Sequence, residues 1–125
     1  MSVDALRGDI PLPGAGEGVS LRFRRVDCGV LQKEFGDEWF TGATGRLDRM
    51  DIAYISKCVE VGAKKGGKEA KVDIDSLDVS LMDICIAILD ALYFAVHGKP
   101  FKDYIEELQR KIDEAKGELD DNPNQ

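Results

Sequence analysis

The sequence predicts an α+β fold that is mostly helical, in which an N-terminal β-hairpin packs on a bundle of about four helices. A glycine-rich turn precedes a segment that alternates apolar and polar residues, as in a hairpin. Apolar residues then recur at three- and four-residue intervals, which is typical of amphipathic helices. With 125 residues, the chain is long enough for one core and too short for two.

Composition divides the chain into four parts. Residues 1–6 are expected to form a flexible leader, and residues 7–98 the domain of hairpin and helices. Residues 99–119 are expected to form a charged C-terminal helix. Residues 120–125 are polar and follow a glycine-weakened last turn, so we expect a disordered tail.

The hairpin is predicted at the start of the domain. Residues 7–12 can form a first extended strand, and residues 14–18 carry glycines able to adopt positive φ angles. Residues 19–24 alternate apolar with polar side chains, as a half-buried second strand does. The second strand is expected to carry three basic residues, Arg22, Arg24 and Arg25, which could pair with carboxylates of the chain. A charged strand edge also discourages aggregation between strands.

Two amphipathic helices are predicted to follow the hairpin. Apolar residues take helical spacing over residues 26–35, and Gly36 is placed to end that helix. The second helix is expected to begin at Asp48, as its N-cap, and to run to Gly62. Both helices have an apolar face that requires a core to pack against.

Two connecting segments are open to more than one interpretation. Trp39 and Phe40 lie in a loop rich in Gly and Thr, where they form either an aromatic plug over the core or an exposed contact patch. Residues 64–68 are basic and flexible, and residues 69–77 are too polar to bury. We expect this stretch to be a linker or a mobile surface loop.

Residues 79–97 are predicted to form a helix that is apolar on nearly every side, with Asp78 as its N-cap. Its polar residues Asp83, Asp90 and His97 recur every seventh position and form one narrow stripe. Such a helix cannot stand alone in water, so its own chain or a partner must surround it. The two carboxylates argue against a membrane span.

A Gly98-Lys99-Pro100 break separates this helix from a strongly charged one at residues 101–119. Its apolar residues follow alternating steps of four and three, the spacing of a coiled-coil seam: Phe101, Ile105, Leu108, Ile112, Ala115 and Leu119. The seam either packs back onto the domain or binds a partner. The predicted partner contacts are Phe101, Ile105, Leu108 and Ile112, with Trp39 and Phe40 as a second patch.

The formal net charge of -7 at pH 7 argues against nucleic acid as a partner, because phosphate binding needs concentrated Lys and Arg. Most of the acidic excess lies toward the C-terminus. It is interpreted either as a solvated face or as a docking surface for a basic partner.

The cysteines and the N-terminus indicate a cellular compartment. Cys28, Cys58 and Cys85 are an odd set, lie far apart and fall on apolar helix faces, so we expect buried free thiols in a reducing cytoplasm. The N-terminus does not resemble a signal peptide, because no basic segment precedes a long apolar run.

No catalytic, cofactor or metal site is expected. His97 is the single histidine and has no obvious catalytic companions; at a helix end it would instead meet the negative end of the helix dipole. The glycines at 14, 16 and 18 precede a strand, whereas a phosphate-binding loop opens a helix. Asp73, Asp75 and Asp78 resemble a calcium loop, but Leu77 stands at the position of the third ligand.

Residues 75–78 also resemble the phosphopantetheine attachment motif of acyl carrier proteins, with Ser76 as the attachment point. An acyl carrier protein would not bring a hairpin, a tryptophan loop and a seam helix. Acidic residues with serine are also common at helix starts, where they act as caps. The carrier therefore stays an alternative, together with a small adaptor that self-associates through the seam.

Several short segments together resemble the small gene transfer agent tail proteins, which are grouped with phage tail assembly chaperones. They are residues 7–10, the glycine-rich turn, residues 19–23, residues 31–36 that close a short helix, and residues 55–62. The similarity covers roughly residues 5–98, and its motifs are short and hydrophobic. The helix at 101–119 is an addition to the compact family pattern.

The resemblance implies a non-enzymatic protein of tail morphogenesis, with the tape measure protein and the tail tube protein as partners. Such chaperones are thought to coat the helical tape measure protein and to recruit tube subunits to it. This implies a location in the cytoplasm of the bacterial host, and it leaves open whether the protein stays in the virion or forms a homo-oligomer. A body with apolar seams that receive amphipathic helices fits that role.

Overall fold

The computed structural model describes residues 9–120, with side chains to Gly117, and has a mostly helical α+β fold. The helices are α2 (Arg25–Phe35), α3 (Ala43–Asp48), α4 (Ile52–Gly62), α5 (Leu81–His97) and α6 (Phe101–Asp120), with short 3₁₀ turns η1 (Gly36–Glu38) and η2 (Ile74–Ser76). The strands are β1 (Ile10–Pro11), β2 (Val19–Leu21), β3 (Ala63–Lys65) and β4 (Lys68–Glu69). The predicted fold class is confirmed. The predicted leader and residues 121–125 of the predicted tail lie outside the described residues.

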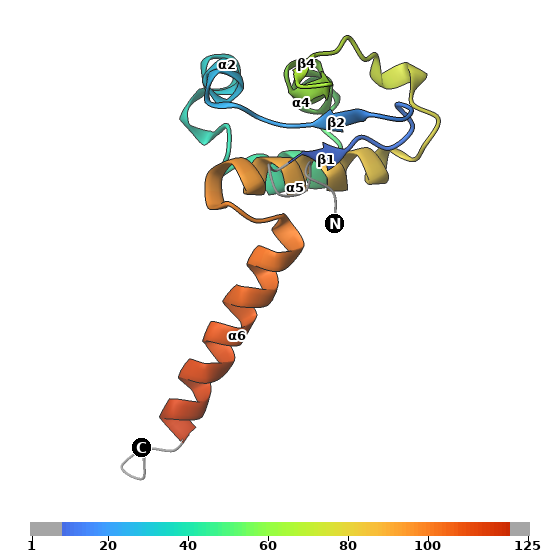
Figure 1. Cartoon of the computed structure of the whole chain (residues 1–125). Helices are drawn as coiled ribbons and strands as arrows, with labels where there is room; N and C mark the ends of the chain where they lie inside the picture. Colours follow the sequence, from blue (N-terminus) through green and yellow to red (C-terminus); the bar gives the residue numbers. More distant parts are fainter. Residues whose placement is uncertain (1–8, 121–125) are drawn as a thin grey trace.

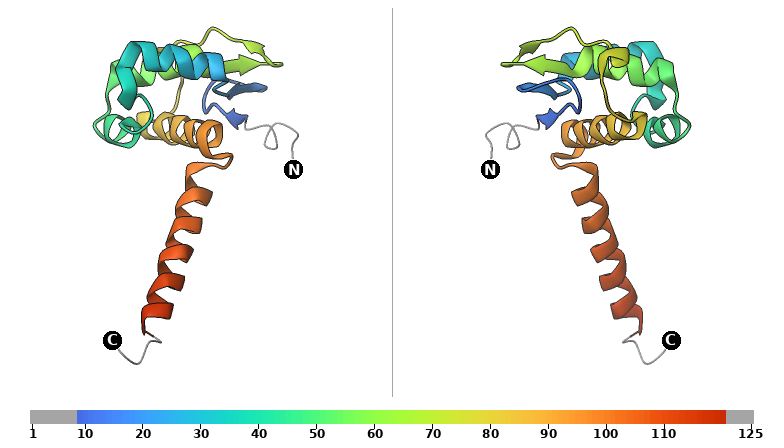
Figure 2. Two further views of the ribbon diagram at one scale, coloured as in Figure 1. Left: turned by 90° about the vertical axis from the view of Figure 1, so that its left-hand side faces the viewer. Right: turned by 90° about the vertical axis from the view of Figure 1, so that its right-hand side faces the viewer.

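The body has three layers. Helices α2 and α4 form one layer, the hairpin β1–β2 lies in the middle, and α5 forms the other layer together with α3 (Figures 1 and 2). Helix α6 leaves the body at the end of α5 and projects away from it (Figures 1 and 2). Over residues 9–120 the chain therefore forms one packed body and one projecting helix.

The predicted hairpin is confirmed, and it is part of a larger sheet. In β1 and β2, Ile10 pairs with Leu21 and Pro11 with Ser20, and the glycines of the connecting turn have positive φ angles. The sheet continues in the antiparallel order β1-β2-β3-β4. The basic segment after α4 is thus a second hairpin, which turns at Gly66 and Gly67 with φ angles of 61° and 80°.

The core lies between the layers. Ile55 and Val59 of α4, Leu21 of β2, and Ile88 and Leu92 of α5 are fully buried. The apolar helix was expected to be surrounded by its own chain or by a partner, and in the structure its own chain buries one face of α5. On another face Met82 and Ile86 remain about half exposed, at 51% and 52%.

Two predicted N-caps are wrong. Asp48 ends α3 instead of starting a helix, because Met50 takes a left-handed conformation with φ 56° and Asp51 caps α4, accepting a hydrogen bond from the Tyr54 N–H at 3.2 Å. At α5 the cap is Ser80, whose hydroxyl accepts from the Asp83 N–H at 3.1 Å, and not Asp78.

The predicted linker at residues 69–77 is also wrong in part. Its start pairs in β4, and its end forms η2 and places Leu77 in the core. Val72 and Ile74 pack against the core as partly buried residues. The stretch is attached to the body because its few apolar side chains, Val72, Ile74 and Leu77, pack against the core although the residues between them are polar.

Candidate partner-binding site

Helix α6 begins after a sharp change of direction. Gly98 takes a left-handed conformation with φ 77°, and its N–H donates to the Phe94 carbonyl at 3.0 Å, which ends α5. The axes of α5 and α6 differ by 63°. The predicted break at Gly98-Lys99-Pro100 is thus confirmed, and it aims α6 away from the body.

Asp90 fixes the start of α6. Its Oδ1 accepts a hydrogen bond from the Phe101 N–H at 3.1 Å, so a carboxylate of α5 caps the positive end of α6. Burial raises the pKa of Asp90, and hydrogen bonds from the backbone of Phe101 and Lys102 oppose that rise. Sequence spacing placed Asp90 in a polar stripe, but it gave no sign of this capping role.

Aromatic rings pack around the same joint. Tyr93 of α5 contacts Phe101 and Tyr104 of α6, with ring centroids 4.8 and 5.1 Å apart, and His97 stacks on Tyr104 at 4.4 Å. Phe101, one of the predicted contact residues, is therefore half-buried in the joint. His97 stands in the last turn of α5, as expected for a residue at the negative end of the dipole.

Beyond the joint, the predicted seam lies open. Ile105, Leu108 and Ile112 are 41%, 43% and 41% exposed, although large apolar side chains at such spacing normally lie against a neighbour. Helix α6 contacts the described body only at its first turns (Figures 1 and 2). The seam is thus available to another helix.

The size of the seam limits how tightly it binds alone. Full burial of a Leu or Ile contributes about 1.5–3 kcal/mol, so covering the exposed two-fifths of three such side chains contributes only about 2–4 kcal/mol. That does not exceed the cost of associating two molecules, which is about 4–15 kcal/mol. A stable complex therefore needs further contacts, from charged groups beside the seam or from the body.

Trp39 and Phe40, the second predicted patch, are half-buried and pack against the core. The Phe40 ring lies 5.0 Å from Tyr93 and 5.7 Å from His97, and the Tyr54 hydroxyl donates to the Trp39 carbonyl at 2.6 Å. This arrangement is that of the plug, one of the two interpretations. It also places the pair beside the α5–α6 joint, and its role in partner binding stays a prediction.

Sequence analysis missed a groove between α3 and α5. It has a volume of about 430 Å³, and its lining is Thr44, Gly45, Leu47, Asp48, Met82, Cys85, Ile86 and Leu89. The signal that could have found it is the spacing of Met82, Ile86 and Leu89, which places a second apolar stripe on α5. The groove is a candidate for the further contacts that the seam needs.

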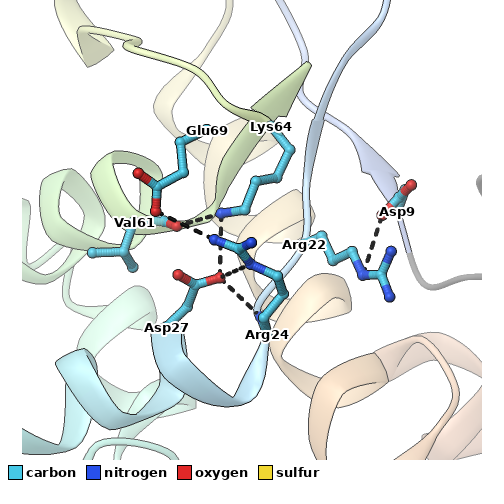
Figure 3. Close-up of polar contacts among 7 residues, drawn as sticks. All are labelled: Asp9, Arg22, Arg24, Asp27, Val61, Lys64 and Glu69. Atoms are coloured by element: carbon cyan, nitrogen blue, oxygen red, sulfur yellow. Dashed lines mark hydrogen bonds and ion pairs between the residues drawn. The ribbon is translucent and has the colours of Figure 1, made fainter. Parts of the chain in front are cut away.

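A buried ion pair attaches α2 to the sheet (Figure 3). Lys64 Nζ lies 3.2 Å from Asp27 Oδ2, both side chains are almost fully buried, and Nζ also donates to the Val61 carbonyl at 2.6 Å. Arg24 pairs with the same carboxylate at 3.4 Å and with Glu69 at 3.3 Å. The Asp27 carboxylate and the Lys64 ammonium are thus buried together, so removing either one would leave the other buried with fewer partners.

The predicted placement of the three arginines on the second strand is wrong. Strand β2 ends at Leu21, Arg24 occupies the N-cap position of α2, and Arg25 begins that helix. The expected pairing with carboxylates is confirmed for Arg22, which lies 3.7 Å from Asp9, and for Arg24 (Figure 3).

The three cysteines and the possible metal ligands were also considered for chemistry. Cys58 and Cys85 are buried free thiols, as expected, and burial raises the pKa of both; Cys28 is half-buried. Among the described residues, no three His, Cys, Asp or Glu side chains are grouped as metal ligands would be.

Ser76, the attachment point of the carrier alternative, lies in η2. Its hydroxyl donates to the Asp73 carbonyl at 2.6 Å, while the Asp73 side chain accepts from the Asp75 N–H at 3.0 Å. Helix α5 begins only at Leu81, so Ser76 is not at the start of that helix, where the attachment motif would place it. No contact here favours the carrier.

In the part of the chain that the structure describes, no single helix is long and apolar enough to cross a membrane. Leu81–His97 and Phe101–Gly117 together have the length and apolar composition of a membrane span, but the two helices are bent by 63° relative to each other.

Comparison of the chain with protein-family models, with curated proteins and with solved structures finds no match.

Proposed function

We propose that this chain is a non-enzymatic assembly protein that captures an amphipathic helix of a partner on the seam of α6. The observation that carries the proposal is the exposure of Ile105, Leu108 and Ile112 on a helix that the body holds out by its joint. A helix laid along these residues would bury them in the helix-in-groove mode. The body serves as the platform, and α6 is the arm.

The resemblance to phage tail assembly chaperones supports a more specific form of this proposal. In that form, the partners are the tape measure protein, which is long and helical, and the tail tube protein. The chain shields apolar positions of the tape measure protein in the cytoplasm of the bacterial host until tube subunits replace it. A weak seam suits this task, because the captured helix must be released when the tube assembles.

The test is a pull-down with the full chain. The double variant Leu108→Asp, Ile112→Asp places two charges on the seam and should abolish capture of the tape measure protein, because buried unpaired carboxylates are costly. The domain should stay folded, since both side chains lie outside the core. Circular dichroism and a thermal unfolding curve check the fold.

A matched control is available on the far side of the same helix. Arg110→Asp changes the net charge by the same two units but leaves the seam intact, so it should capture as the wild type does. Unchanged capture by the double variant, or equal loss in both proteins, would count against the seam.

A further inference from the structure

Charges on α6 are distributed unevenly around the seam. In the heptad nomenclature abcdefg, Ile105 and Ile112 of the seam occupy position a, and Phe101, Leu108 and Ala115 occupy position d. Positions e and g, which face a partner's flanks, then hold Lys102, Lys111 and Lys116. Most of the acidic residues lie farther round the helix, at positions b, c and f: Asp103, Glu106, Glu107, Asp113 and Glu114. Glu118, in the last turn, is the exception. The helix is acidic overall, yet the edges of its seam are basic.

Ion pairs near the body increase this contrast. Glu107 is held between two lysines, with Lys111 Nζ 3.2 Å from one carboxylate oxygen and Lys99 paired to the other. One carboxylate thus faces two ammonium groups, and the local charge remains positive. The Lys111 side chain is still 66% exposed, so it can also reach a group on a partner.

A hollow of about 260 Å³ lies beside these lysines. Its lining is His97, Lys99, Tyr104, Glu107, Leu108 and Lys111. Tyr104 and Leu108 contribute apolar surface to its lining, and Lys99 and Lys111 contribute two positive charges against the single carboxylate of Glu107. It fits an apolar side chain of a helix that carries carboxylates at its edges.

A second copy of this chain does not match the seam. In a parallel pair, Lys111 of one α6 would face Lys116 of the other copy; in an antiparallel pair with the seam residues in register, the two Lys111 side chains would face each other. Like charges at these positions oppose pairing. Charge complementarity therefore selects a different molecule.

We propose that the occupant of the seam is an amphipathic helix of another protein, with Leu- or Ile-type residues along its face and Asp or Glu at the flanking e and g positions. This inference rests on the proposed function and adds the chemistry of the partner. It also replaces the sequence-based idea of a basic partner, because the edges of the seam, and not the far face, meet the bound helix.

Two synthetic helical peptides test it with the full chain. Both carry four heptads with Ile and Leu at a and d; one has Glu at every e and g position, the other Lys. Each peptide repels copies of itself, so neither dimerises strongly. In fluorescence anisotropy at low salt, the Glu peptide should bind about tenfold more tightly than the Lys peptide, and added salt should reduce the difference.

A charge reversal on the chain provides the matched pair of variants. Lys111→Glu should weaken binding of the Glu peptide, whereas Arg110→Glu, the same charge change on the far face, should leave it unchanged. The preference should also disappear when Lys102, Lys111 and Lys116 are all changed to Glu.

The outcomes separate this inference from the proposed function. Equal binding of both peptides, if the double variant Leu108→Asp, Ile112→Asp abolishes it, would disprove the preference for acidic flanks but support helix binding on the seam. Binding of neither peptide by the folded protein overturns the inference, and the pull-down then decides the seam separately. Self-association that the same double variant abolishes would overturn the inference in favour of a second copy.

Discussion

Asp90 is a half-buried ionisable residue of α5, and its carboxylate caps the start of α6. Burial raises the pKa of Asp90 above its ordinary value of 3.8, so the folded protein holds the proton at pH values where the unfolded chain releases it. Stability from this group is therefore greatest at low pH and falls as pH rises from 3.8 through the raised pKa.

We predict that Asp90→Asn gains stability relative to the wild type as pH rises over that range, because Asn keeps the accepting oxygen but has no charge to desolvate. Urea unfolding at a series of pH values measures the difference. Asp90→Ala is the control: without the cap it should be less stable than Asp90→Asn, by about 1 kcal/mol. A difference between wild type and Asp90→Asn that does not vary with pH would contradict this account.

Lys64 is a charged residue whose side chain is buried inside the body. Its side chain is almost fully buried against Asp27, so Lys64→Met leaves a carboxylate with Arg24 as its remaining cationic partner. We predict a loss of about 3 kcal/mol in the free energy of unfolding, at the low end of the cost of breaking a buried pair, because Arg24 still partners the carboxylate.

The neighbouring residue is the control for Lys64. Lys65 is exposed, so Lys65→Met should change stability by no more than about 0.5 kcal/mol. Urea unfolding of both variants under identical conditions gives the comparison. Equal effects would show that the buried pair contributes nothing beyond an ordinary surface lysine.

At the level of elements, periodic patterns predicted α2, α4, α5 and α6, but they missed the short helix α3 and placed helix ends less well. The helix predicted over residues 26–35 matches α2, and Gly36 ends it as expected. Asp48 and Asp51 both precede α4 and either could be its N-cap. The left-handed backbone of Met50 separates α3 from α4, so that Asp51 is the cap. That conformation has no signature in the sequence, because non-glycine residues rarely adopt it.

Strands β3 and β4 were missed because all their residues except Ala63 have charged side chains, which normally indicate a loop. Lys64 can be buried in β3 only because Asp27 of α2 lies opposite it, and such a pairing is not visible in a local pattern. The seam of α6 could be predicted, since its spacing lies within one helix. The Asp90 cap could not, because it depends on how α5 and α6 meet. The groove between α3 and α5 could be predicted only in part: the spacing of Met82, Ile86 and Leu89 gives its α5 wall, but not the packing of α3 against it.

For the molecule as a whole, the arrangement separates stability from binding. The body holds the described buried core, and α6 is attached to it by one cap and a cluster of rings. The predicted fold class is confirmed, whereas the partner and the tail assembly role stay predictions. Substitutions along the exposed part of α6 should thus change binding without unfolding the body.

Hydrogen exchange of the backbone amides, with and without the Glu-flanked helix, shows whether the seam of α6 is uncovered in the free protein and covered in the complex. In the free protein, amides of α6 beyond Tyr104 should exchange much faster than those of α5, because the body does not cover them. Binding should slow exchange along residues 105–115 and leave the core unchanged. Slow exchange of α6 in the free, monomeric protein, equal to that of α5, would show that the seam is already covered by its own chain and would rule it out as a free binding surface.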